Sequence, residues 1–168
     1  MRALLVDGYN IIHAHPRLSQ VVGEDQEAAR EGLLREVAPL ASPAFYGMVV
    51  VVFDAAGSRN PEPVSEERGG MTVVFTRRGQ TADSFIEAAV KRLAAAHEVE
   101  VATSDRVLSG VSSGFGARVM GGEALLALAR EALSETREEL KRLRGRKRPP
   151  LEERVSEEIR RLLDQMRY

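Results

Sequence analysis

Residues 4–16 read LLVDGYNIIHAHP, and this stretch places Asp7, Gly8 and Asn10 directly after an apolar run of strand length. Two interpretations of the stretch are open. Asp7 to Asn10 is either the polar turn that ends a buried strand, or the place where a strand delivers a carboxylate to a reaction. The stretch alone does not decide between these interpretations, so evidence from the rest of the sequence is needed.

Four further apolar runs of strand length follow the first one at 3–6, and helical patterns separate them. Several runs lack the alternation of apolar and polar residues, as expected of strands that are covered on both faces. Strands that alternate with helices predict an α/β fold with a mostly parallel sheet. The further strands are predicted at 48–53, 71–76, 99–103 and 117–120, and the helices at 25–40, 81–97, after residue 105, and at 122–143.

Two segments are predicted to lie outside this pattern. Residues 57–70 contain Pro61 and Pro63 and are predicted to form a mobile loop. Pro149 and Pro150 are predicted to end the last long helix, and the periodicity of 152–166 favours a C-terminal helix that docks on the body or on a partner.

The composition predicts one core of ordinary domain size. The chain has 168 residues, of which 43% are hydrophobic, so we expect a domain at 1–136 and a charged helical extension at 137–168. Cysteine is absent, which excludes disulfides, thiolate metal sites and thiol nucleophiles and fits a reducing compartment. No 18 apolar residues run together, so we expect a cytoplasmic protein without a membrane partner.

The charge is unevenly distributed, although the net charge is only −1. Residues 137–168 carry eleven Lys and Arg against seven Asp and Glu, which leaves −5 for residues 1–136. A dense positive block is a typical footprint for nucleic acid, and a solvated linker is the alternative. The block consists of Lys141, Arg142, Arg144, Arg146, Lys147 and Arg148.

Four aspartates are predicted to meet at one edge of the sheet. Asp7, Asp54 and Asp105 each follow a predicted strand, and Asp83 lies in the first turn of a predicted helix. In an open α/β sheet the ligand crevice lies outside the carboxyl ends of the strands. Helical spacing also places Glu87 on the face of Asp83.

Each aspartate on its own has an ordinary explanation as a helix cap, a turn former or a partner of the helix dipole. Four of them at one edge are different, because like charges destabilise the fold unless they share a cation. Carboxylates without histidine or cysteine select Mg²⁺ or Mn²⁺, the ions of phosphodiester hydrolysis. Asn10 suits such a site as a neutral donor to phosphate or to water.

The sequence lacks the motifs of several other reaction classes. Gly114-Phe115-Gly116 lacks the third glycine of a dinucleotide fingerprint, and the chain contains neither GxxxxGK[ST] nor GxSxG. An aspartyl-phosphate phosphatase needs a second aspartate two residues after the first, whereas Tyr9 stands at that position after Asp7.

Five segments resemble, in order and spacing, the YacP-like branch of the NYN domains, a PIN-like nuclease group. They are LLVDGYNII (4–12), VVVVFDA (49–55), VVFTRRGQTADSFIE (73–87), VEVATSDR (99–106) and ARVMGGEALLALAR (117–130). The resemblance implies a PIN-like three-layer α/β/α fold with a basic C-terminal helical extension, and an acidic pocket that binds Mg²⁺ or Mn²⁺ and cuts RNA. The best studied member of the branch is a ribosome-associated bacterial endoribonuclease thought to cleave messenger RNA during translation.

Carried over by motif, the family's functional positions fall on Asp7, Asn10, Asp83 and Asp105 as catalytic residues. The first hypothesis is therefore a metal-dependent endoribonuclease with Asp7, Asp83 and Asp105 as metal ligands and Asp54 or Glu87 completing the site. Its RNA contacts would be Arg77, Arg78 and the Lys141 to Arg148 block. The alternatives are a non-catalytic RNA-binding or ribosome-binding module, and a nuclease that cleaves structured DNA.

Overall fold

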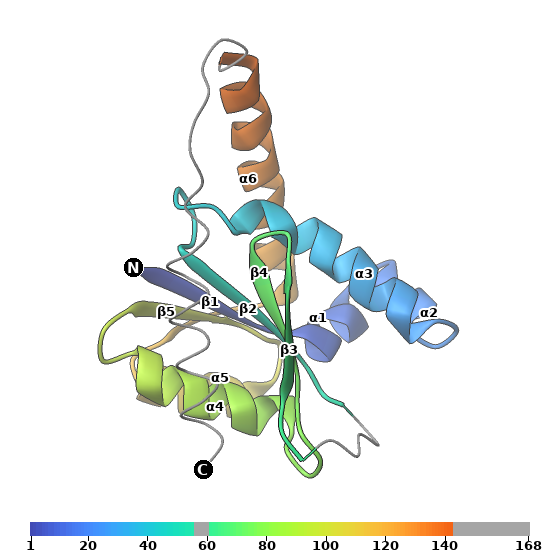
Figure 1. Ribbon diagram of the computed structural model, residues 1–168, viewed down its shortest axis with the longest axis vertical. Coiled ribbons are helices and arrows are strands. Elements are labelled where there is room, and N and C mark those ends of the chain that lie inside the picture. The colour runs from blue at the N-terminus through green and yellow to red at the C-terminus, as the bar shows by residue number, and fades with distance from the viewer. Residues whose placement is uncertain (56–60, 143–168) are drawn as a thin grey trace.

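The computed structural model describes residues 1–55 and 61–142, which form a six-stranded sheet between two layers of helices (Figure 1). The elements in chain order are β1 (Arg2–Asp7), α1 (Gly8–Ala14), α2 (Leu18–Val21), α3 (Gln26–Val37), the 3₁₀ helix η1 (Ala38–Leu40), β2 (Met48–Phe53), β3 (Val64–Arg68), β4 (Met71–Phe75), α4 (Ala82–Leu93), β5 (Glu98–Ala102), α5 (Arg106–Gly114), β6 (Arg118–Met120) and α6 (Gly122–Arg142).

The order of the strands places Asp7 at the point where a ligand crevice forms. The sheet runs β3-β4-β2-β1-β5-β6, and every pair is parallel except β3 with β4. Strand β1 lies between β2 and β5, so the chain builds the sheet outward from β1 in both directions. In an open α/β sheet this switch point is where ligands bind, beyond the carboxyl ends of the strands. Asp7 is the last residue of β1.

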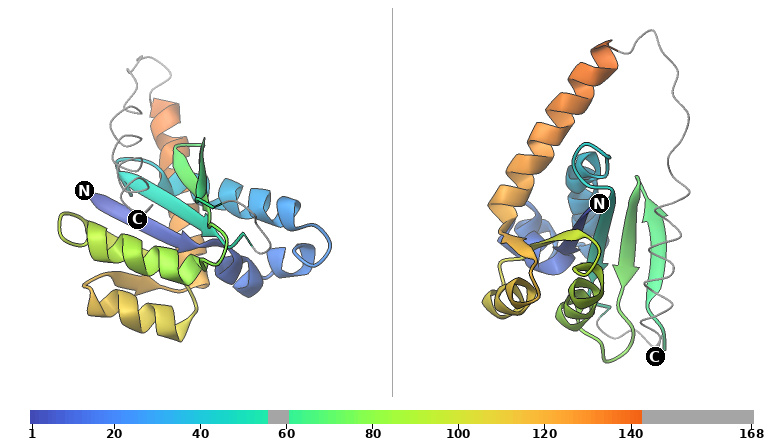
Figure 2. Two further views of the ribbon diagram at one scale, coloured as in Figure 1. Left: turned by 60° about the horizontal axis from the view of Figure 1, so that its bottom comes forward. Right: turned by 90° about the vertical axis from the view of Figure 1, so that its left-hand side faces the viewer.

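Successive residues of β1 point into two separate cores, which is why the run at 3–6 shows no polar alternation. Leu4 and Val6 join the core under α1, α3 and α6, whereas Ala3 and Leu5 join the core under α4 and α5. Figure 1 shows α4 below β1 and β2 and α6 above them, and Figure 2 shows the same layers from two further sides. The predicted α/β fold with a mostly parallel, doubly covered sheet is confirmed.

The prediction of a loop over all of residues 57–70 is wrong in part, because β3 (Val64–Arg68) lies within that range. All five residues of β3 are exposed, since this edge strand covers no core. Its position is set by a tight hairpin, in which Gly69 and Gly70 have φ of 57° and 78° and connect β3 directly to β4. Two successive residues with positive φ are typical of a type I′ turn.

Helices α1 and α2 were not predicted, because seven and four residues are too few for a helical pattern to stand out. Helix α1 begins at Gly8, which has no positive φ. Glycine is required at this position because there is no room for a side chain. A Cβ atom there would lie 2.3 Å from Phe53 Cε1 and 2.9 Å from the Val52 carbonyl oxygen.

The predicted extension is described only in its first part. Helix α6 continues to Arg142 and passes the predicted boundary at residue 136, which stays a prediction. Arg144, Arg146, Lys147 and Arg148, the stop at 149–150 and the predicted helix at 152–166 lie outside the described residues. Within the described ranges, no helix combines the length and the apolar character that crossing a membrane requires.

Candidate functional site

Asp7 is a buried carboxylate at the centre of the carboxyl edge of the sheet. The residue is 5% exposed, and its Oδ2 accepts a hydrogen bond of 3.2 Å from Thr103 Oγ1. Burial and the charge of Asp83 raise the pKa of Asp7 to about 6, with a smaller contribution from Asp105. Contacts with Thr103 and the Asn10 backbone oppose this rise. Asp7 is therefore a carboxylate that the fold holds at an electrostatic cost.

Asp83 lies in the first turn of α4 but does not cap this helix. Thr81 is the N-cap, and its hydroxyl accepts a 3.1 Å hydrogen bond from the Ser84 backbone N–H. Burial, followed by the charge of Asp105, raises the pKa of Asp83, with contributions from Glu87 and Asp54. Asp83 is therefore not a cap. Its place in the first turn fits the predicted compensation of the helix dipole, and it also lies near the carboxylates of Asp105 and Glu87.

Asp105 has two roles. Its Oδ1 accepts hydrogen bonds from the backbone N–H groups of Val107 (2.7 Å) and Leu108 (2.9 Å), so it is the N-cap of α5 as the ordinary explanation holds. Its charge also raises the pKa of both Asp7 and Asp83. Because both capping bonds fall on Oδ1, the cap leaves Oδ2 for a further ligand.

Asn10 ties α1 to the loop between β5 and α5. Its Oδ1 accepts a 2.6 Å hydrogen bond from the Ser104 backbone N–H. The carbonyl oxygen is thus already in use, and the side-chain amide remains as a donor. A donor beside carboxylates can bind a phosphate oxygen or a water molecule, which matches the predicted role of Asn10.

The predicted carboxylates are therefore electrostatic neighbours, although they do not form a closed ligand shell. The structure links these carboxylates through their charges. Asp83 and Asp105 raise the pKa of Asp7, and the pKa of Asp83 is raised in turn by Asp105, Glu87 and Asp54. Oxygen donors of this kind fit a hard divalent cation. Among the residues that the structure describes, however, no three His, Asp or Glu side chains lie close enough together to hold a metal ion.

A sequence model of the YacP-like NYN domain matches residues 4–168. The chain belongs to the YacP-like NYN domain family. YacP of Bacillus subtilis is 36% identical over 137 residues, which are 80% of this chain and 75% of that protein. Two crystal structures, of Rae1 (YacP) from Bacillus subtilis and of a single-residue mutant of that protein, match with TM-scores of 0.70 and 0.67 at 30% identity. They cover 99% and 98% of this chain, and the matches span 95% and 94% of those chains.

Membership of the NYN domain family confirms the PIN-like fold and supports a nuclease-like role that involves RNA. Asp7, Asp83 and Asp105 are the strand-end and helix-start residues that the motifs singled out, and each is coupled by charge to the other two.

The predicted basic residues fall into two separate groups in this NYN domain. Arg77 and Arg78 are exposed in the segment between β4 and α4, next to the start of the helix that carries Asp83. Helix α6 begins beside α1, where a Cβ on Gly122 would lie 3.7 Å from Ile11 Cδ1. Lys141 lies near the other end of α6, about 28 Å along its axis from Gly122 at 1.5 Å per residue. The basic block therefore starts far from the carboxylates.

Thr103 is a positioning residue that the sequence analysis did not identify. The residue is 2% exposed, and its hydroxyl donates to Asp7 Oδ2 while it accepts a 3.1 Å hydrogen bond from the Asp105 backbone N–H. One side chain thus aligns the ends of β1 and β5. No signal in the sequence identifies this contact, because it depends on β1 and β5 lying side by side.

Substitutions at Asp105 separate its two roles. Asp105→Asn keeps an N-cap, so the free energy of unfolding should change by less than about 0.5 kcal/mol, whereas Asp105→Ala should lose about 1 kcal/mol. Both should lose the RNA cleavage that is proposed below, because neither supplies a charged oxygen. Urea unfolding and a cleavage assay measure the two effects. Full cleavage by Asp105→Asn would show that Asp105 is only a cap.

Proposed function

We propose that this protein is a metal-dependent endoribonuclease that hydrolyses RNA phosphodiester bonds at the carboxyl edge of the sheet. The observation that carries the proposal is the burial of Asp7 among acidic neighbours, which raises its pKa to about 6. Such a cluster is costly to maintain unless its charge serves a cation. The NYN domain family supplies the reaction class, since its members are PIN-like nucleases.

In this proposal Asp7, Asp83 and Asp105 hold Mg²⁺ or Mn²⁺, and Asp54 and Glu87 add negative charge around them. The ion would supply an activated water and stabilise charge on the scissile phosphate. Thr103 holds the Asp7 carboxylate in place from its buried position. Asn10 keeps its orientation through the bond to Ser104 and offers its amide to a phosphate oxygen.

On the basis of the family resemblance, we propose that the substrate is messenger RNA on the ribosome and that the protein therefore acts in the cytoplasm. Arg77 and Arg78 would hold the RNA backbone beside the reaction, because arginine contacts to phosphate give affinity without reading sequence. Lys141, the first residue of the basic block, would hold polyanion at a distance from the cleaved bond, since it lies near the end of α6.

A non-catalytic RNA-binding module is the second candidate, and one observation favours it: within the described ranges no three metal-binding side chains come together. The two functions differ in one assay. Labelled RNA and DNA of the same sequence are incubated with the protein in Mn²⁺, in Mg²⁺ and in chelator, and messenger RNA is tested free and on translating ribosomes.

The proposal predicts RNA products that require the metal and increase on ribosomes. Binding without any product in all conditions would support the non-catalytic module instead. Cleavage of DNA at the rate of RNA would contradict the RNA assignment but not the metal site.

Removing the charges of Arg77 and Arg78 tests the RNA path. Arg77→Ala combined with Arg78→Ala should weaken RNA binding and lower the slope of log K against log salt by about 0.7 for each phosphate that is no longer neutralised. The matched control is Lys91→Ala with Arg92→Ala, which removes the same charge from the far end of α4. Titrations at several salt concentrations measure the slope. Equal slopes for the two double variants would contradict the assignment.

A further inference from the structure

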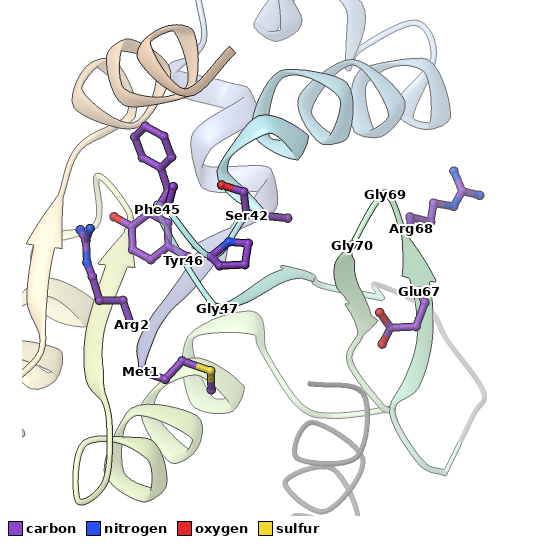
Figure 3. Close-up of a pocket in the computed structure, with 13 residues that line it drawn as sticks. Met1, Arg2, Ser42, Phe45, Tyr46, Gly47, Glu67, Arg68, Gly69 and Gly70 are labelled. Atoms are coloured by element: carbon purple, nitrogen blue, oxygen red, sulfur yellow. The ribbon is translucent and has the colours of Figure 1, made fainter. Parts of the chain in front are cut away.

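Arg68 lines two cavities of different character. The larger one, of about 790 Å³, lies at the amino ends of the parallel strands, away from the carboxylates, and Figure 3 shows the Arg68 side chain pointing away from it. The guanidinium of Arg68 pairs instead with Glu31 of α3 and Glu66 of β3. These residues line a smaller cavity of about 200 Å³ between α3 and the strands β2, β3 and β4. The smaller cavity is the one that reaches the acidic edge of the sheet.

Phe53 and Phe75 connect the smaller cavity with the acidic edge. They lie opposite each other at the ends of β2 and β4, and both line the cavity. Phe53 directly precedes Asp54, and β2 is the neighbour of β1, with Val52 opposite Asp7. Strands lie about 4.8 Å apart, so β4 is about 10 Å from β1. Successive nucleotides rise about 3.4 Å along a strand, so a base within about three nucleotides of a phosphate at Asp7 can reach the cavity.

Flat side chains come together at this cavity. The rings of Phe53 and Phe75 stack with their centroids 5.8 Å apart, and the Arg30 guanidinium lies 5.6 Å from the centroid of the Phe75 ring. Arg30 Nη1 also donates a 2.8 Å hydrogen bond to the Tyr9 hydroxyl, and the Tyr9 ring meets Phe53 edge-on at 5.2 Å. Phenylalanine and the tyrosine hydroxyl are neutral, so these contacts fix the guanidinium without neutralising its charge. Bases of single-stranded RNA stack on aromatic rings and on arginine planes of this kind.

The size and the charge of the cavity favour a base over the other parts of an RNA strand. Pockets for drug-sized ligands have about 300–1,000 Å³, so a cavity of about 200 Å³ suits a single ring system. A phosphate is repelled, because three carboxylates stand against two guanidinium groups in the lining, a local balance of −1. A neutral base is not repelled, and its N–H groups can donate to the carboxylates. The charged residues of the lining are Glu27, Glu31, Glu66, Arg30 and Arg68.

We propose that the smaller cavity binds one unstacked base of the RNA substrate, and that Phe75 and Arg30 hold this base. Tyr9 positions Arg30 through its hydroxyl. A base held there would fix the strand relative to Asp7 and so select the bond that is presented for cleavage. This inference rests on the proposed ribonuclease function and deepens it, since it assigns Phe75 and Arg30 to substrate binding and not to the chemical step.

The test uses RNA oligonucleotides of one sequence that each carry a single abasic nucleotide at a different position. They are incubated with the full chain in Mn²⁺, and the bond that is cut fixes the register of the strand. The wild type should cut a given bond about tenfold more slowly when one particular base near it is missing, as expected for the loss of a stacked base. Phe75→Leu and Arg30→Gln should each be about tenfold slower on the intact RNA and should no longer respond to the loss of that base.

Arg35→Gln is the matched control, because Arg35 is an exposed arginine of the same helix that does not line the cavity. This variant should behave as the wild type does. If the same abasic position slowed the wild type and both cavity variants by equal factors, the proposal would be overturned in favour of a phosphate contact. Normal cleavage without any sensitive position would overturn the base-binding role and leave the proposed function intact.

A second measurement needs neither cleavage nor a substitution. Leu34 lines the cavity and is 5% exposed, whereas Leu93 is 4% exposed and lies in the core on the other face of the sheet. In chelator, RNA should shift the NMR signals of the Leu34 methyl groups through the ring current of the bound base, and leave those of Leu93 unchanged. A ribose-phosphate oligomer without bases should shift neither. The absence of the Leu34 shift, or the same shift with the oligomer that lacks bases, would overturn the proposal even if the protein cut no RNA.

Discussion

Asp7→Asn is expected to abolish RNA cleavage and, at the same time, to stabilise the fold near neutral pH. The loss of activity should be at least about 100-fold, because even groups that only support a metal ligand cost 10–100-fold when removed. The gain in stability follows from the burial of Asp7 among Asp83 and Asp105, which raises its pKa to about 6. An uncharged isostere removes that cost while it can still accept the hydrogen bond from Thr103.

The sign of the pH dependence follows from the raised pKa. Folding disfavours the charged form of Asp7, so the wild type loses stability as the pH rises from about 3.8 to about 6. A shift of about two pKa units corresponds to about 2–3 kcal/mol. In chelator, Asp7→Asn should therefore match the wild type below pH 3.8 and exceed it by about 2 kcal/mol at pH 7.

Urea unfolding at about pH 3.5, 5 and 7 measures this difference. Asp25→Asn is the control, because Asp25 caps α3 through its side chain, away from the acidic cluster, and asparagine also caps well. That variant should keep both stability and cleavage. If Asp7→Asn were less stable than the wild type at pH 7, the electrostatic account of the cluster would be wrong.

Gly8→Ala is expected to lower the free energy of unfolding by about 2–3 kcal/mol, which is the upper range for overpacking a core. The added Cβ would lie 2.3 Å from Phe53 Cε1, and Phe53 is fully buried at the end of β2. The second close contact is with backbone, the Val52 carbonyl oxygen at 2.9 Å, which cannot rotate away. Movement of α1 would also displace Asn10, so cleavage should fall as well.

Gly110→Ala is the matched control for this effect. Gly110 also lies in a helix, but nothing lies within 4 Å of the position of its Cβ. Alanine there should stabilise the protein by about 0.5–1 kcal/mol, because glycine loses more backbone freedom on folding. Thermal unfolding of both variants measures the difference. A neutral Gly8→Ala would show that the contact with Phe53 is not restrictive.

Much of the fold could be predicted because its central strands are buried on both faces. The apolar run at 48–53 coincides with β2, since no polar position interrupts a strand that two cores cover. Strand β3 could not be predicted in the same way, because its residues VSEER are all exposed and its pairing depends on the Gly69-Gly70 turn. Edge strands carry little signal of burial.

The acidic edge of the site could also be predicted, because parallel strands end on one side and Asp7 and Asp105 follow strands. The role of Thr103 could not, since it depends on β1 and β5 lying side by side, with Val6 opposite Ala102. A threonine at a strand end carries no charge pattern that reveals such a contact. The double role of Asp105, as cap and as part of the acidic cluster, likewise needs the geometry of α5.

The measurement that tests the central claim most directly is the rate of RNA cleavage as Mn²⁺ is added, for the wild type and for Asp7→Asn combined with Asp83→Asn. Both proteins are first freed of metal with chelator, and their circular dichroism is compared to show that both are folded. The account predicts no cleavage by the wild type in chelator, a rate that rises to saturation with Mn²⁺, and no cleavage by the double variant at any concentration. Cleavage by the double variant at the wild-type rate, or a wild-type rate that does not depend on the metal, would contradict it.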